Sequence, residues 1–134
     1  MTHQIQKLNI SNFIALKGYL SQNCIVRELH NNDFLVLSSD METFGVVLIE
    51  AQACGLPVIA TDCGGPRDII SSDTGILVKL GSSVELAKGL KKMACGLNNY
   101  NPDIIRSKTV KQFGKNAYAE AMIGIIKKII STSI

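Results

Sequence analysis

Three short apolar runs, separated by polar or glycine-rich stretches, set the pattern of the chain. They are Phe34–Leu37, Val58–Ala60 and Gly75–Val78, and all three are rich in β-branched or large aliphatic side chains. Continuous apolar runs of this length are typical of strands covered on both faces, as in a parallel sheet. Pro57 falls at the start of the second run, where a missing N–H donor is tolerated. We therefore predict a parallel sheet built from these runs.

Helical patterns fill the intervals between the predicted strands. One helix is expected over residues 21–31, and another runs from a cap at Ser82–Ser83 to about Cys95, with Glu85 in its first turn. Residues 96–102 have the composition of a loop, and one long helix is expected to close the chain. Strands that alternate with helices indicate an α/β fold.

Two glutamates lie between the first two predicted strands. A helix that begins near Phe44–Gly45 places Glu42 and Glu50 about 12 Å apart along the axis and within about 80° of each other. An acid beside the first turn is favourable to the helix dipole, which is a sufficient structural reason for Glu42. Glu50 lies in an apolar helix, and such a helix is usually buried. We therefore expect its carboxylate to have a partner: a basic side chain, a backbone amide or a ligand hydroxyl.

The motifs around these glutamates resemble the C-terminal domain of the retaining nucleotide-sugar glycosyltransferases of group 1, which have the GT-B architecture. The matching segments are Leu16–Leu20, Val36–Ser39, Glu42–Ala51, Ala53–Thr61, Gly64–Gly65 and Gly75–Val78. The resemblance implies a three-layer, Rossmann-like parallel sheet. It also implies that residues 1–134 form part of the domain that binds the nucleotide-sugar donor.

The resemblance implies a role for each matching residue. Glu42 would be catalytic, since it would lie by the donor sugar and the positive charge that develops at the anomeric carbon. Glu50 would accept hydrogen bonds from the ribose hydroxyls. The backbone amides of Phe44, Gly45 and Val46 would bind the diphosphate, as a helix N-terminus favours.

A further binding position follows from the same resemblance. The nucleotide base would pack near Gly18 and Tyr19, in the loop after the apolar run at residues 13–16. The donor is a nucleoside diphosphate sugar, and the resemblance implies no metal and no other cofactor.

The resemblance also implies that parts of the enzyme are absent from this sequence. In the family, the domain opens with two strands and an Arg–Lys pair that grips the diphosphate, whereas residues 1–9 resemble the helix before the third strand. The N-terminal acceptor-binding domain is absent too, so the chain resembles a fragment that is inactive alone. Residues 13–16 would pair with residues 34–37, pair with a second copy, or stay loose. An exposed central strand edge is expected to favour self-association or marginal stability.

Composition and charge exclude several classes of function. With 134 residues, 46% of them apolar, the chain is long enough for one domain with a modest core. The net charge of +3 is too small to indicate nucleic-acid binding. Residues His3 and His30 carry no ligand pattern, which agrees with the absence of a predicted metal. No apolar stretch is long enough to span a membrane and no secretion signal is evident, so we expect a cytoplasmic protein.

The closing helix has two interpretations. Apolar side chains recur at helical spacing with two lysines among them: Met122, Ile125, Ile126, Lys127, Lys128, Ile129 and Ile130. This face either packs back on the domain or touches an anionic membrane at its cytoplasmic side. The small number of basic residues favours packing on the domain.

The predicted function is that of a glycosyltransferase fragment. The complete enzyme would transfer a sugar from a nucleoside diphosphate sugar to an acceptor hydroxyl and retain the anomeric configuration. Two alternatives stay open: a non-catalytic nucleotide-binding module that acts through a partner, and a truncated remnant that binds nothing. The motifs do not specify the base, the sugar or the acceptor.

Overall fold

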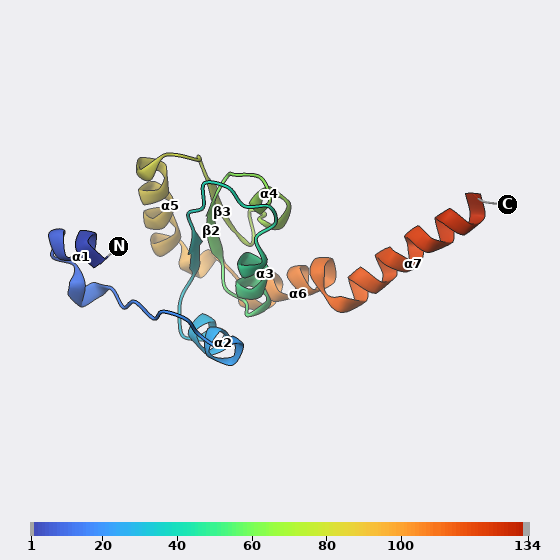
Figure 1. Cartoon of the computed structure of the whole chain (residues 1–134), viewed down its shortest axis with the longest axis horizontal. Coiled ribbons are helices and arrows are strands. Elements are labelled where there is room, and N and C mark those ends of the chain that lie inside the picture. The colour runs from blue at the N-terminus through green and yellow to red at the C-terminus, as the bar shows by residue number, and fades with distance from the viewer. Residues whose placement is uncertain (1, 133–134) are drawn as a thin grey trace.

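The computed structural model describes residues 2–132, in which a small parallel sheet lies between layers of helices (Figure 1). In chain order the elements are α1 (Thr2–Lys7), the 3-10 helix η1 (Ser11–Phe13), α2 (Gln22–His30), β1 (Leu35–Leu37), α3 (Val46–Ala53), β2 (Val58–Thr61), α4 (Pro66–Ile69), β3 (Gly75–Val78), α5 (Ser83–Cys95), η2 (Leu97–Asn99), α6 (Pro102–Phe113) and α7 (Lys115–Thr132).

The sheet has the order β1-β2-β3, and both strand pairs are parallel. Leu35 lies opposite Val58, and Val58 lies opposite Gly75. Parallel neighbours require crossovers, and α3 and α4 lie in the two connections. The three predicted strands and the α/β class are therefore confirmed.

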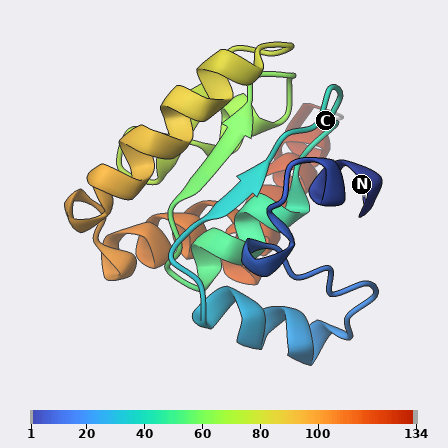
Figure 2. The ribbon, with the colours of Figure 1, turned by 90° about the vertical axis from the view of Figure 1, so that its left-hand side faces the viewer.

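The central strand packs against helices on both of its faces. Val58 and Ala60 belong to one buried cluster together with Leu48 of α3. Ile59, which points to the opposite face, belongs to a second cluster with Met93 of α5. Figure 2 shows α5 on one side of the sheet and α3 on the other. The predicted three-layer arrangement is confirmed, since apolar residues on both faces of β2 need a cover.

Two of the predicted helices begin and end close to their expected positions. Ser82 precedes α5, and its Oγ accepts a hydrogen bond of 3.2 Å from the backbone N–H of Glu85. This contact is the predicted N-terminal cap. Ser21 precedes α2 in an extended conformation, and its side chain makes no capping hydrogen bond.

The apolar run at residues 13–16 lies outside the sheet. Its first residue, Phe13, ends η1 and is 87% exposed. Of the three arrangements considered, the chain by itself adopts the unpaired one. In a parallel ladder, successive residues direct their backbone N–H and C=O groups alternately to the two sides of the strand. The Leu35 N–H donates to the carbonyl of Pro57, on the side of β2. Val36 therefore directs its N–H and C=O to an open edge of the sheet.

The closing segment contains two helices, so the prediction of one long helix is wrong. The break is at Gly114, whose φ of −69° and ψ of 160° are extended rather than helical. A Cβ at this position would lie 2.4 Å from the carbonyl oxygen of Val110. Only glycine allows the chain to turn this closely against the end of α6.

The prediction that the closing helix packs on the domain is also wrong. After its contact with α6, α7 extends away from the sheet (Figure 1). The exposed fractions of Met122, Ile125 and Ile126 are 40%, 56% and 50%. The physical reason is that α6 already fills the place beside α3, where Ile105 is fully buried. None of the helices within residues 2–132 has both the length and the apolar character that a membrane crossing requires.

The register of β2 and β3 leaves no room for a side chain at Gly75. A Cβ there would lie 2.1 Å from the carbonyl oxygen of Val58. We expect Gly75→Ala to lower the free energy of unfolding by about 2–3 kcal/mol, because the two strands must separate. Urea unfolding followed by circular dichroism measures this. Gly124→Ala is the control, since Gly124 has open space around it in α7; an equal loss in both variants would contradict the expectation.

Candidate functional site

The turn after β1 ends in a glycine that opens α3. Gly45, the N-cap of α3, has φ +97° and ψ 50°, a left-handed conformation that favours glycine. Its carbonyl accepts a hydrogen bond of 2.9 Å from the Leu48 N–H, which closes the first turn. No side chain caps this helix, so its first N–H groups lack helical partners and are open to an anion.

A second glycine turn, after β2, packs directly against the first. Glu42 and Gly64 form an isolated parallel bridge, and the Gly65 N–H donates to the Glu42 carbonyl over 3.1 Å. A Cβ at Gly65 would lie 2.6 Å from the Cα of Phe44, so the two backbones touch. Both turns follow the carboxyl ends of neighbouring parallel strands, which is where open α/β sheets bind ligands.

The side chain of Glu42 folds back on its own turn. Its Oε1 accepts a hydrogen bond of 3.3 Å from the backbone N–H of Phe44. The Phe44 ring meets Phe113 of α6 edge-to-face, with 6.0 Å between ring centroids. The structure thus brings Glu42, Phe44, Gly45 and Val46 together at the start of α3.

Glu50 lies about one turn into α3 and is half-buried. Among residues 2–132 its carboxylate has no hydrogen bond and no ion pair. The expected burial of this apolar helix is confirmed on the side formed by Leu48, Ala51 and Gln52, whereas Val46 at its start is 58% exposed. The Glu50 carboxylate is therefore available to a ligand without the cost of a fully buried charge.

No hydrogen bond or ion pair within the described residues joins Gly18 or Tyr19 to this turn. Gly18 has a left-handed φ of +65°, and the Tyr19 side chain is 96% exposed. The segment that contains them runs from η1 to α2 (Figure 1). Their place at the nucleotide base stays a prediction.

Three polar residues beside the site were not singled out from the sequence. Thr61, the last residue of β2, donates its hydroxyl proton to the carbonyl of Ser39 in the turn after β1. Arg67 forms a bidentate pair with Asp62, and through this hydrogen bond it holds the pKa of Asp62 below its usual range. A sequence signal existed only for Asp62, as an acid directly after a predicted strand. The Arg67 side chain is exposed.

Comparison with known proteins identifies the family. Residues 1–120 match the model of the family described as "Glycosyl transferases group 1". The chain belongs to the group 1 glycosyltransferases. This confirms the family that the motifs indicated, and the match extends well beyond the motif segments, which run from Leu16 to Val78.

Individual relatives place this glycosyltransferase chain among larger proteins. It is 38% identical over 78 residues to the 2-deoxystreptamine N-acetyl-D-glucosaminyltransferase of Niallia circulans, which covers 58% of this chain and 20% of that protein. Sucrose-phosphate synthase from Thermosynechococcus elongatus superimposes with a TM-score of 0.85 at 25% identity, over 98% of this chain and 34% of that one. The chain thus spans about a fifth to a third of the length of these two proteins.

A third similarity concerns the fold alone. Anabaena HepE, crystallised in complex with UDP, superimposes with a TM-score of 0.83 at 21% identity, over 95% of this chain and 35% of that one.

Within residues 2–132 of the present chain, no three histidine, cysteine or acidic side chains gather in a way that could hold a metal ion.

The contact between the two turns gives a direct test of the site. We expect Gly65→Ala to push the turns apart, because its Cβ would clash with the Phe44 backbone. The Glu42 carbonyl would lose its donor, and amide hydrogen exchange at position 65 should accelerate by about tenfold or more, equivalent to roughly 1.4 kcal/mol. Thr43→Ala in the same turn is the control, since this exposed side chain makes no hydrogen bond within residues 2–132. Unchanged exchange in Gly65→Ala would contradict the expected coupling.

Proposed function

We propose that this chain is the donor-binding part of a retaining glycosyltransferase. The reaction is transfer of a sugar from a nucleoside diphosphate sugar to an acceptor hydroxyl. The observation that carries the proposal is the pair of glycine turns in contact at the carboxyl ends of β1 and β2, with the open N-terminus of α3 beside them. Anabaena HepE, which shares the fold, was crystallised with UDP, and this supports a nucleoside diphosphate as the ligand.

The backbone amides at Phe44, Gly45 and Val46 suit a diphosphate. The N–H groups of Gly45 and Val46 have no hydrogen bond among residues 2–132 and lie at the positive end of the α3 dipole, and Gly45 offers no side chain that would obstruct the phosphate. The Phe44 N–H is the amide that Glu42 Oε1 contacts. A diphosphate that binds this amide would displace the like-charged carboxylate, and Glu42 would then be free to turn toward the donor sugar.

Glu42 and Glu50 would act at opposite ends of the donor. As the bond between the anomeric carbon and the diphosphate oxygen breaks, positive charge grows on the sugar, and a carboxylate at Glu42 would stabilise it. The diphosphate leaves with the bonding electrons, and the acceptor hydroxyl gives its proton to an oxygen of the departing diphosphate as its own oxygen bonds the same carbon. Glu50, further along α3, would accept hydrogen bonds from the ribose hydroxyls. Gly18 and Tyr19 stay as the proposed contact for the base.

The acceptor and the complete reaction belong to the whole protein. We propose that a separate acceptor-binding domain completes the active site, since the chain spans only 20–34% of the two catalytic relatives named above. A non-catalytic nucleotide-binding module and a remnant without binding are the alternatives. We expect the protein to act in the cytoplasm, and this location stays a prediction.

Glu50 provides the test of donor binding. Isothermal titration of the chain with uridine, guanosine and adenosine diphosphates and their sugars identifies the base. We expect Glu50→Ala to weaken the preferred donor by about tenfold or more, because a charge-assisted hydrogen bond is lost. Glu120→Ala on α7 is a matched control, as it removes an exposed helical carboxylate elsewhere. Unchanged affinity in Glu50→Ala would refute its role, and silence across the panel would favour the remnant.

Two partner surfaces supplement this function. The exposed apolar face of α7 supports peripheral contact with an anionic membrane, and the open edge of β1 at Val36 supports association with a second copy. The first proposal rests on apolar side chains of α7, and the second rests on backbone groups of β1 without a neighbouring strand. Both sets of groups face solvent in the single chain.

Vesicle binding tests the first surface. We expect the chain to co-sediment with vesicles that contain phosphatidylglycerol, and Ile125→Asn/Ile126→Asn to reduce the bound fraction at least several-fold, because two apolar side chains no longer insert. Val84→Asn is the control, since Val84 is an exposed apolar residue on α5. Binding that is equal in both variants would contradict a role for α7. Light scattering of the protein without vesicles reports any dimer.

A further inference from the structure

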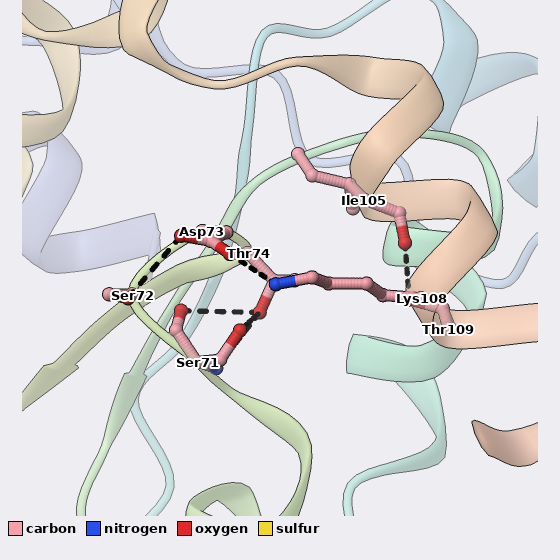
Figure 3. Close-up of polar contacts among 7 residues, drawn as sticks. All are labelled: Ser71, Ser72, Asp73, Thr74, Ile105, Lys108 and Thr109. Carbon is pink, nitrogen blue, oxygen red and sulfur yellow. Dashed lines mark hydrogen bonds and ion pairs between the residues drawn. The ribbon is translucent and has the colours of Figure 1, made fainter. Parts of the chain in front are cut away.

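Helix α6 is joined by side chains to the segment that connects β2 with β3. Lys108 forms an ion pair with Asp73 in the loop before β3, as Figure 3 shows. Gln112, about one turn further along the helix, donates its side-chain N–H to the carbonyl of Asp68 in α4 over 3.2 Å. Both partners lie between β2 and β3, so these contacts fix α6 relative to the sheet.

The loop that carries Asp73 is ordered by its own hydrogen bonds. Thr74 is 3% exposed, and its Oγ1 accepts a hydrogen bond of 2.9 Å from the Ser71 N–H. Figure 3 shows the side chains of Ser71 and Thr74 facing each other beside Lys108. The anchor of α6 at Asp73 is thus a hydrogen-bonded loop with a defined conformation.

The packing of α6 on α4 is interrupted. A cavity of about 560 Å³ lies between α4, the loop before β3 and α6. Its basic side chains are largely paired with acidic ones, which leaves little net charge for a ligand. Contact between α6 and the two glycine turns therefore depends on the residues at the end of the helix, beyond this cavity.

Phe113 is the last residue of α6, and it contacts both the core and the turn before α3. It is half-buried and packs against the buried cluster that includes Leu48 of α3 and Ile69 of α4. Its ring meets the Phe44 ring edge-to-face, with 6.0 Å between the centroids and 79° between the ring planes. This geometry places the positive edge of one ring against the negative face of the other. Phe113 therefore connects α6 with the turn that opens α3.

Phe44 is held at three points in this turn. Its N–H donates to Glu42 Oε1 over 3.3 Å, and its backbone touches Gly65, where a Cβ would lie 2.6 Å from the Phe44 Cα. The third point is the ring contact with Phe113, which alone of the three comes from outside the glycine turns. When a diphosphate replaces the Glu42 carboxylate, as proposed above, Gly65 and Phe113 are the contacts that still orient the Phe44 amide.

We propose that Phe113 is a positioning residue of the donor site. It does not touch the donor, and its ring holds Phe44 so that the N–H groups of Phe44 and Gly45 face the diphosphate. This role rests on the donor function proposed above. Phe44 is 45% exposed, and without the Phe113 ring it loses its aromatic partner, so its backbone samples more conformations. Binding of a diphosphate would then have to order the turn first, which weakens the affinity.

Isothermal titration of the full chain with UDP, GDP and ADP tests this role. We expect Phe113→Leu to weaken the tightest of the three by about threefold to tenfold, since an edge-to-face pair contributes about this factor to an equilibrium constant. Phe113→Tyr keeps the ring and should restore the wild-type affinity. Ile104→Ala, which truncates an exposed apolar residue near the start of α6, is the control and should leave the affinity unchanged.

The order of the Phe44 amide gives a second readout, which a purely structural role would not change. In the free protein the NMR order parameter of this N–H should fall from about 0.85 to about 0.6 in Phe113→Leu and stay high in Phe113→Tyr. A residue that only stabilises the core would lower the urea midpoint and leave this order parameter unchanged. If Phe113→Leu does not fold, Phe113→Met takes its place, because its flexible side chain fills the same space without a ring.

The outcomes distinguish this role from the donor function itself. Failure of the wild-type chain to bind any of the three diphosphates would refute the donor function, and with it the role of Phe113 in that function. Diphosphate binding that is equal in the wild type and Phe113→Leu would overturn this proposal alone. An equal loss in Phe113→Leu and Ile104→Ala, or an unchanged order parameter at Phe44, would overturn it as well.

Discussion

The backbone contact between the turn after β1 and the turn after β2 is the constraint on which the candidate site depends. Glu42 and Gly64 pair as in a sheet, beyond the ends of the named strands, and the Gly65 N–H holds the Glu42 carbonyl. Such an approach is possible only because Gly65 has no Cβ. Thr61 adds a side-chain hydrogen bond to Ser39 across the same two strands. Together these contacts fix the point at which α3 begins, and with it the direction of its free amides.

The central strand β2 is the core around which the helices of this small chain pack. Val58, Ile59 and Ala60 are all fully buried, and helices cover both faces of the strand. The cover is uneven beyond this strand, because β1 has an open edge and α7 leaves the body of the protein. A short sheet has too few positions to bury every apolar side chain of its helices. The apolar groups that remain outside are the ones available to other molecules.

The short helix α4 connects two chemically different surfaces. Its first turn follows the glycine pair that contacts Glu42, whereas Arg67 and the following residues face the cavity closed by α6. The two glycine turns offer backbone amides beside the Glu42 carboxylate, whereas the cavity is lined by basic side chains that are largely paired with acidic ones. The first surface suits the nucleoside diphosphate that we propose as its ligand.

The sequence by itself determined the three parallel strands, their α/β class and the start of α5 at Ser82, because these depend on local periodicity and on a cap within one turn. It also identified the glutamate and glycine motif of a group 1 glycosyltransferase. Only the tertiary structure decided whether α7 packs on the domain, since the sequence pattern of an isoleucine-rich helix face is the same whether that face is buried or exposed. The half-exposed state of Glu50 and the cavity at Gln52 likewise depend on which helix lies alongside α3. These contacts form between residues that are far apart in the sequence, and no local sequence pattern specifies which distant residues meet.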